Sequence, residues 1–306
     1  MKRIMSAIAA ATLALTLAAC SDDADTNGTS ATEEGGQTAE GFLATDLSDI
    51  DKVDEIAAMV PEAIAEDGKL TVGTNIFFAP AEFYAPDGVT PQGYDIDMGK
   101  AIAQVLGLEF EAQQAEFASI IPGIGTRYEI GIANFTINAE RQEAVNMLQY
   151  FEAGSAWAVQ AGNPDNFDPA DVCGKVIGVQ SGTYQDEVLA DMNTTVCADN
   201  PIQVQQLSEQ SAVTMRVSSG QIDAMYTDSP VADYAAAITE GQVERVGEVE
   251  DSAGFGVVVA KDDQELTDAL EAAMNYLMDE GHMDDIFATW GITEGVSTEV
   301  AVNPAS

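Results

Sequence analysis

The sequence IGIANFTINAER, residues 130–141, joins a short apolar run to a polar turn that ends in an arginine. Residues 130–133 are apolar without alternation, which is typical of a strand buried on both faces of a sheet. In the turn, the Asn134 amide, the Thr136 hydroxyl and free backbone N–H groups can converge with Arg141. A guanidinium binds a carboxylate through two parallel hydrogen bonds. The stretch therefore predicts an anion clamp, with an ordinary turn and a surface arginine as the alternative.

The composition limits the class of protein and its partners. The chain has 306 residues, of which 46% are hydrophobic, and carries 52 acidic against 11 basic side chains, for a formal charge of −41. The apolar content suffices for one or two packed cores. So acidic a chain repels nucleic acid, and nucleic-acid binding is excluded. Molar salt screens such charges within about 3 Å. The charge therefore predicts either a salt-rich habitat or acidic faces that serve solubility alone.

The first 20 residues have the pattern of an export signal. A short basic start, MKR, precedes an apolar run over residues 4–18 that is too short to span a bilayer. The run ends in LAAC, which resembles the lipobox of bacterial lipoproteins. This resemblance implies cleavage before Cys20 and attachment of diacylglyceryl and palmitoyl chains to it. The mature protein is then expected on the outer face of the cytoplasmic membrane; a plain secretory signal is the alternative.

Residues 21–44 are mostly Ser, Asp, Thr, Gly, Glu and Ala with no basic residue, which predicts a flexible tether. Two cysteines follow in the exported part, Cys173 and Cys197, and an even pair outside the cytoplasm predicts a disulfide. Closing its loop would stabilise the fold by about 3 kcal/mol. A metal-ligand or nucleophile role lacks a partner, because the single histidine, His282, is far away in the sequence. We therefore expect no metal and no cofactor.

The remaining chain alternates between strand and helix patterns, which predicts an α/β fold with a mostly parallel open sheet. A second unit of the same kind begins after the polar break at 162–165. Apolar stripes with helical spacing end in Gly107 and Gly281, two residues suited to helix C-termini. The expected strands cover 69–74, 109–112, 130–133, 145–148, 176–179, 202–207, 222–226 and 255–260. The expected helices cover 53–60, 98–106, 119–126, 184–192, 211–218, 230–238, 266–277 and 286–290, and residues 75–80 are expected to form a loop.

These elements carry motifs that resemble the type 3 extracellular solute-binding proteins, the receptors of amino-acid ABC importers. The resemblance covers residues 69–291 in unbroken order. Its motifs are GTN at 73–75, GYDID at 93–97, FASIIP at 117–122, NFTINAER at 134–141, GVQSGT at 178–183, DSP at 228–230 and the closing helices through Trp290. The family implies a two-lobe, Venus-flytrap fold with two crossing hinge strands, near 152–155 and 251–254. It also implies a monomer that serves a permease and its ATPase.

By position, this resemblance divides the chain into six parts. They are a lipoprotein signal at 1–20, a tether at 21–44, lobe 1 at 45–152, lobe 2 with the hinge strands at 153–253, a return to lobe 1 at 254–293, and a polar, frayed tail at 294–306.

The resemblance also assigns the ends of an amino-acid ligand. Arg141 would pair with its α-carboxylate, helped by Thr136 and the Thr183 backbone. Asp228 would accept its α-ammonium group, with the Asn134 carbonyl as a further acceptor; a helix N-cap is the other role for Asp228. Because Arg141 and Asp228 fall on opposite lobes, one ligand would bridge both and favour the closed state.

Further matched positions surround the ligand side chain. They are Phe78, Phe117, Gln180, Tyr184 and Gln185. Core packing is the alternative for the two phenylalanines. Asn75 stands where many members that take cationic amino acids carry an aspartate, and no basic residue at these positions could pair a second carboxylate. The pocket is therefore expected to take an uncharged polar or aromatic amino acid.

Two other functions use the same scaffold. Exported cyclohexadienyl dehydratases resemble this fold, and a general acid such as Glu82 or Glu116 could serve such an enzyme. A sensory receptor domain is the second alternative, although no membrane-spanning or kinase segment is fused to this chain. The prediction is a receptor that performs no chemistry and delivers its ligand to a permease.

Overall fold

The computed structural model describes residues 37–38 and 42–305. The predicted leader, Cys20 and most of the predicted tether therefore lie outside the described residues. Two short strands, β1 (Gln37–Thr38) and β2 (Phe42–Leu43), pair antiparallel ahead of the main fold. Within the described part of the chain, no helix combines the length and the apolar character needed to cross a bilayer.

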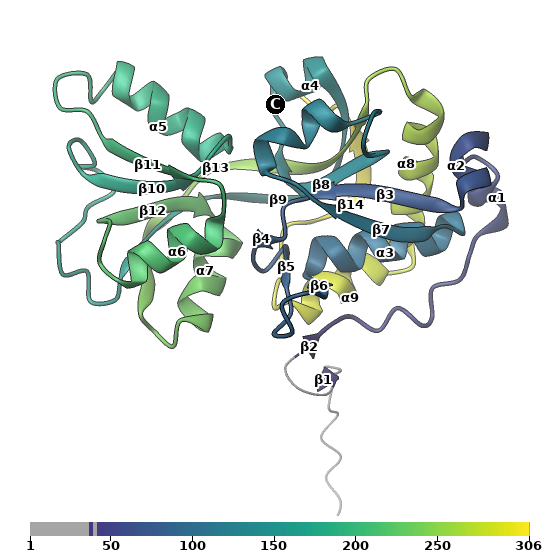
Figure 1. The fold of residues 1–306 in the computed structure, drawn as a ribbon, viewed down its shortest axis with the longest axis horizontal. Helices are drawn as coiled ribbons and strands as arrows, with labels where there is room; N and C mark the ends of the chain where they lie inside the picture. The colour runs from purple at the N-terminus through teal and green to yellow at the C-terminus, as the bar shows by residue number, and fades with distance from the viewer. Residues whose placement is uncertain (1–36, 39–41, 306) are drawn as a thin grey trace, which may run out of the picture. The chain divides into compact units, whose positions relative to one another are not determined.

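A nine-stranded sheet organises the protein, in the order β11-β10-β12-β9-β13-β8-β3-β7, with β14 paired to β9 (Figure 1). Its strands are β3 (Lys69–Thr74), β7 (Glu109–Gln114), β8 (Ile130–Thr136), β9 (Val145–Gln160), β10 (Val176–Gln180), β11 (Gln203–Leu207), β12 (Ala224–Asp228), β13 (Val243–Ala260) and β14 (Val296–Val302). The pairs β3–β7 and β3–β8 are parallel, as are β10–β11 and β10–β12. The predicted strand-helix alternation thus produces two parallel groups.

The two long strands, β9 and β13, join these groups. The first part of β9 pairs with β13 next to β8, and its last part pairs with β12. The register between β9 and β13 shifts near residues 250–253, and a Cβ on Gly154 would lie 2.4 Å from the Glu250 carbonyl oxygen. These are the two predicted crossing strands, and each is continuous rather than a short strand followed by a linker. We call the elements around β3, β7 and β8 the first lobe and those around β10, β11 and β12 the second lobe.

Helices cover both lobes, and each lobe has its own apolar core. In the first lobe they are α1 (Asp54–Ala57), α2 (Glu62–Asp67), α3 (Tyr94–Leu106), α4 (Ala139–Ala144), α8 (Gln264–Asp279) and α9 (His282–Thr289). In the second they are α5 (Tyr184–Thr194), α6 (Gln210–Ser218) and α7 (Ser229–Ile238). The stripes of α3 and α8 are buried in the first core, as their spacing predicts, and Gly107 is the left-handed cap of α3.

Three expectations for the first lobe need correction. The predicted helix at 119–126 is instead two 3₁₀ turns, η1 (Phe117–Ser119) and η2 (Ile121–Gly123), because Pro122 and two glycines disfavour a longer helix. The segment at 75–80, expected as a loop, contains β4 (Phe77–Phe78), which forms a small antiparallel sheet with β5 (Glu82–Tyr84) and β6 (Pro91–Gln92). Strand β8 continues to Thr136, so Asn134 belongs to the strand.

The expectation that residues 294–306 form a frayed tail is also wrong. Residues 296–302 form β14, which pairs antiparallel with β9, and Asn303 donates its backbone N–H to the Met147 carbonyl oxygen at 2.8 Å. The β-branched residues of VSTEVAV suit a strand of this kind. The C-terminal segment is therefore part of the first lobe.

The predicted disulfide is confirmed. Cys173 and Cys197 are bonded with their Cα atoms 5.2 Å apart, and both pack against the core of the second lobe. The link therefore leaves the connection between the lobes free.

Candidate functional site

Arg141 lies in the first turn of α4, directly after the end of β8. Asn138 caps this helix, and its Oδ1 accepts the Arg141 backbone N–H at 2.8 Å. Arg141 is only 7% exposed, so the alternative of an ordinary surface arginine is wrong. It donates from Nη1 to the Thr136 carbonyl oxygen at 2.8 Å and from Nη2 to the Gly182 carbonyl oxygen, in the second lobe, at 3.2 Å. A buried cation of the first lobe thus contacts the second lobe directly.

Asp228 ends β12 in the second lobe and precedes α7. Asp228 occupies the N-cap position of that helix, as the alternative reading expected, but its side chain makes no capping hydrogen bond. Instead it accepts a hydrogen bond from Gln185 Nε2 at 2.7 Å, and Gln185 also donates to Ser155 Oγ at 2.9 Å. Asp228 is 3% exposed, and this burial raises its carboxyl pKa to about 7, while the nearby positive charge of Arg141 opposes the rise. The structure therefore brings Arg141 and Asp228 together from opposite lobes.

Asn134 adopts a left-handed backbone conformation, with φ of 47°. Its Nδ2 donates to the Tyr94 hydroxyl at 2.7 Å, and its Oδ1 accepts the Tyr150 hydroxyl at 3.1 Å. Its backbone N–H donates to Asp95 Oδ2 at 3.0 Å, and Asp95 Oδ1 accepts Tyr150 at 2.8 Å. The Asn134 amide is thus engaged inside the first lobe, which corrects the expectation that it is free to meet an anion.

The Thr136 and Thr183 positions flank Arg141 from the two lobes. Thr136 contacts Arg141 through its carbonyl oxygen, which occupies one guanidinium N–H. Thr183 caps α5: its Oγ1 donates to the Gln180 carbonyl oxygen at 2.8 Å and accepts the Asp186 backbone N–H at 3.3 Å. The N-terminal turn of α5 therefore lies close to Arg141, a placement that favours negative charge.

The predicted side-chain positions separate into polar and aromatic groups. Asn75 accepts a hydrogen bond at Oδ1 from Gln180 Nε2, 2.9 Å away in the other lobe, and donates to the Ala115 carbonyl oxygen at 2.8 Å. Gln180 Oε1 is buried and meets no donor among the described residues. Phe117 stacks on Phe135, with ring centroids 4.9 Å apart, and also lies under Arg141. The alternative of core packing therefore describes Phe117, which also lies next to the Arg141 guanidinium.

Phe78 and Tyr184 complete the predicted set. Phe78 is buried and packs with the core of the first lobe, while Tyr184 is partly exposed at the start of α5. Partial burial raises the pKa of the Tyr184 hydroxyl. The geometry thus groups Asn75, Gln180, Arg141 and Asp228 at the contact of the two lobes.

The sequence prediction gave several residues of this region no part in ligand binding, and it named Glu82 only as a possible general acid of the dehydratase alternative. Tyr94 and Tyr150 hold Asn134, and a third buried carboxyl, Glu82, lies close to Asp95 and Asp228. Asp95 belongs to the motif GYDID, which was a usable signal for its importance. Glu82 sits in a hairpin of mixed polarity, where nothing in the local pattern indicates burial.

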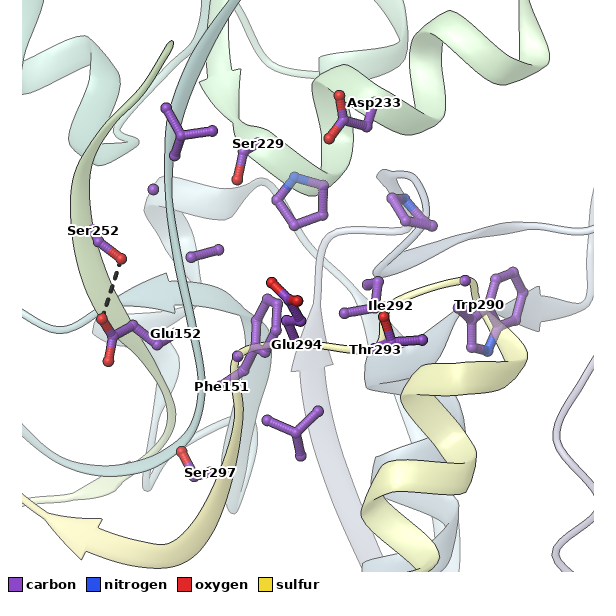
Figure 2. A pocket seen from close by; sticks show the side chains of 18 of the residues that line it. Phe151, Glu152, Ser229, Asp233, Ser252, Trp290, Ile292, Thr293, Glu294 and Ser297 are labelled. Atoms are coloured by element: carbon purple, nitrogen blue, oxygen red, sulfur yellow. Dashed lines mark hydrogen bonds between the residues drawn. The ribbon is translucent and has the colours of Figure 1, made fainter.

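A cavity of about 1040 Å³ is lined by none of the predicted ligand-binding residues (Figure 2). It is bordered by the C-terminal segment after Trp290, by the crossing strands near Glu152 and Ser252, and by the start of α7 near Ser229. The described residues contain no cluster of side chains suited to holding a metal ion. The candidate site is therefore the charged contact between the lobes rather than this cavity.

Comparison with known proteins identifies the family of this chain. Residues 70–293 match the model of the bacterial extracellular solute-binding proteins, family 3. The chain belongs to this family. This confirms the family and the two-lobe α/β fold predicted from the motifs.

Relatives of this solute-binding protein are binding proteins by name. The arginine-binding protein ArgT of Corynebacterium glutamicum is 36% identical over 258 residues, which cover 83% of this chain and 84% of the relative. A solved mutant of ArgBP from T. maritima is 27% identical, with a TM-score of 0.69, and covers 75% of this chain and 98% of its own. An ancestral arginine-binding protein, solved with arginine, is 32% identical, with a TM-score of 0.67, and covers 73% and 98% of the two chains. The names of these relatives agree with the prediction of a protein that is not an enzyme.

Proposed function

We propose that this protein is the receptor of an amino-acid ABC importer, which binds one free amino acid between its lobes. The observation that carries the proposal is the pair of buried, opposite charges, Arg141 and Asp228, supplied by different lobes. A zwitterion leaves water only where both of its charges meet hydrogen-bonding partners, because an unpaired buried charge is costly. Arg141 would bind the α-carboxylate beside the N-terminal turn of α5, and Asp228 would accept the α-ammonium group.

The ligand side chain is proposed to be that of arginine. The expectation of an uncharged ligand rested on Asn75, and the relatives named above do not support it. Away from Asp228, the lobe contact has a surplus of hydrogen-bond acceptors, because the buried Gln180 Oε1 receives no hydrogen bond from the described residues. A guanidinium group carries five N–H donors and no acceptor, which suits this surplus of acceptors.

A second candidate, an uncharged amide such as glutamine, is favoured by one contact. The Asn75 and Gln180 side chains, which bond to one another, are neutral and offer both donors and acceptors. An amide side chain could replace one partner in this bond.

Delivery to the membrane is the remaining part of the proposal. We propose anchoring through Cys20, with residues 21–44 as the tether. The receptor is proposed to be a monomer whose first lobe covers 45–152 and 254–305 and whose second lobe covers 153–253. Closure around the ligand would present both lobes to the permease of the transporter, which works with its ATPase.

A thermal-unfolding screen of the purified protein tests the proposal. Each amino acid, and separately prephenate and arogenate, is added in low and in high salt. A ligand at 100 times its Kd stabilises the folded state by about 2.7 kcal/mol, which raises the melting temperature by several degrees. The largest shift is expected with arginine. A shift with prephenate or arogenate alone would favour the dehydratase alternative, and no shift with any amino acid would refute the receptor.

A further inference from the structure

A cluster of three carboxyls lies beside the proposed ammonium site. We call Glu82, Asp95 and Asp228 the acid cluster; their residues are 0%, 1% and 3% exposed. Glu82 and Asp95 belong to the first lobe and Asp228 to the second. The sequence analysis gave a binding role to Asp228 alone, and the proposed function makes no use of Glu82.

The fold forces Glu82 and Asp95 together. Asp95 donates its backbone N–H to the Ala81 carbonyl oxygen at 2.9 Å, which fixes the start of α3 against β5. A Cβ on Gly93 would lie 2.1 Å from that same oxygen, and Gly93 has a φ of 130°. Only glycine permits this approach. The segment that carries Glu82 therefore cannot move away from Asp95 without breaking the turn.

The two neighbouring carboxyls differ in their partners. Asp95 accepts hydrogen bonds from the Asn134 backbone N–H and the Tyr150 hydroxyl, which stabilise its ionised form. Neither oxygen of Glu82 receives a hydrogen bond from the described residues. A buried carboxylate without donors is strongly disfavoured. Glu82 therefore holds a proton, which it can donate to Asp95.

The charges around the acid cluster reinforce this arrangement. Burial, followed by repulsion from Asp95 and Asp228, raises the pKa of Glu82 well above its usual value. Burial also raises the pKa of Asp95 to about 7, although the bonds from Tyr150 and Asn134 oppose the rise. The groups that face the cluster are Tyr94 at the start of α3, Asn134 on β8, Tyr150 on β9, Gln185 on α5 and Arg141 on α4. Arg141 is the one cation among these groups.

We propose that Glu82 is a further recognition residue of the amino-acid site and that the ligand's ammonium group replaces the proton held there. This inference rests on the proposed function. The ammonium group has three N–H donors. Asp228 and the Asn134 carbonyl would accept two of them, and the ionised Glu82 would accept the third. On binding, the Glu82 O–H bond breaks, the proton passes to solvent, and the ligand keeps all of its own protons.

The exchange gives ligand binding a defined pH dependence. Burial raises the pKa of Glu82 well above its usual value, so wherever Glu82 is protonated the ammonium group must displace this proton before it binds. Affinity is then highest above the pKa of Glu82 and falls as pH decreases below it, by up to tenfold per pH unit for one proton. The α-amino and guanidinium groups of arginine stay charged throughout this range, so the dependence belongs to the protein.

Calorimetric titration of the purified protein with L-arginine measures the released proton directly. At about pH 8, where Asp95 and Asp228, with pKa values of about 7, are mostly ionised, titrations in buffers of different ionisation enthalpy should report close to one proton released per ligand bound. Glu82→Gln keeps the shape of the side chain but cannot ionise, so it should bind L-arginine with this release lost and with a flatter pH profile. Glu55→Gln, which removes an exposed carboxyl of the first lobe, is the matched control and should behave as the unaltered protein.

The possible outcomes separate the two proposals. Binding of L-arginine by the unaltered protein without proton release would overturn the role of Glu82 and leave the receptor intact. Release that persists in Glu82→Gln would do the same. If Glu82→Gln does not fold, the proton count and the pH profile of the unaltered protein decide the inference. Absence of binding by every amino acid would instead refute the receptor itself.

Discussion

Replacement of Arg141 by alanine should almost abolish ligand binding. The guanidinium is buried and donates to two carbonyl oxygens, one in each lobe. Its removal would leave the ligand carboxylate unpaired in a closed site. Removing one partner of a buried ion pair costs about 3 to 5 kcal/mol. At 1.4 kcal/mol per factor of ten, this corresponds to an affinity loss of roughly two to three and a half orders of magnitude.

Arg141→Lys is the matched variant, because it keeps the positive charge and changes its geometry. An ammonium group is a point charge and cannot form two parallel bonds to a carboxylate. The loss of one charged hydrogen bond corresponds to about 1.5 to 3 kcal/mol, or roughly 10- to 150-fold in affinity. The expected order of affinity is therefore arginine, then lysine, then alanine at position 141.

Calorimetric titration with the amino acid that gives the largest thermal shift measures all three proteins. The melting temperature of each empty protein is the control for folding, since Arg141 lies at the lobe contact and outside the apolar cores of either lobe. Binding by Arg141→Ala within a few-fold of the unaltered protein would refute the role of the guanidinium. Equal losses in both variants would refute the argument from two parallel bonds.

Three other changes probe the second lobe, the lobe contact and the C-terminal strand. Replacing Cys173 and Cys197 by serine should lower the free energy of unfolding by about 3 kcal/mol in urea titrations, with affinity unchanged; a large loss of affinity would contradict a disulfide confined to one lobe. Gln180→Ala removes the bond to Asn75 and should weaken binding roughly fivefold, and tighter binding would contradict this. Deleting residues 294–306 should lower the melting temperature, and an unchanged value would show that β14 adds no stability.

Much of the fold is visible in the sequence because local patterns decide it. The apolar run of β8 and the helical stripe of α8 are buried as their periodicity requires. Strand β9 was expected only over 145–148, because its later residues pair with two different neighbours and show no simple alternation. Likewise, β14 depends on an edge of β9 that no local pattern reveals.

The charged residues of the site could be predicted from the sequence, whereas the contacts that hold the site together could not. Arg141 and Asp228 stand in recognisable motifs, and the structure places both at the lobe contact. The left-handed conformation of Asn134 depends on Tyr94, Asp95 and Tyr150, which come from other elements of the first lobe. The burial of Glu82 results from the close approach of β5 and α3, which is a tertiary contact without a local signature.

A crystal structure of the protein with arginine tests the central claim most directly. The predicted result is a ligand held between the lobes, with its carboxylate paired to Arg141 and its ammonium group bonded to Asp228. A ligand found in the cavity beside Trp290, or one bound in the reverse orientation with its side chain at Asp228, would contradict it.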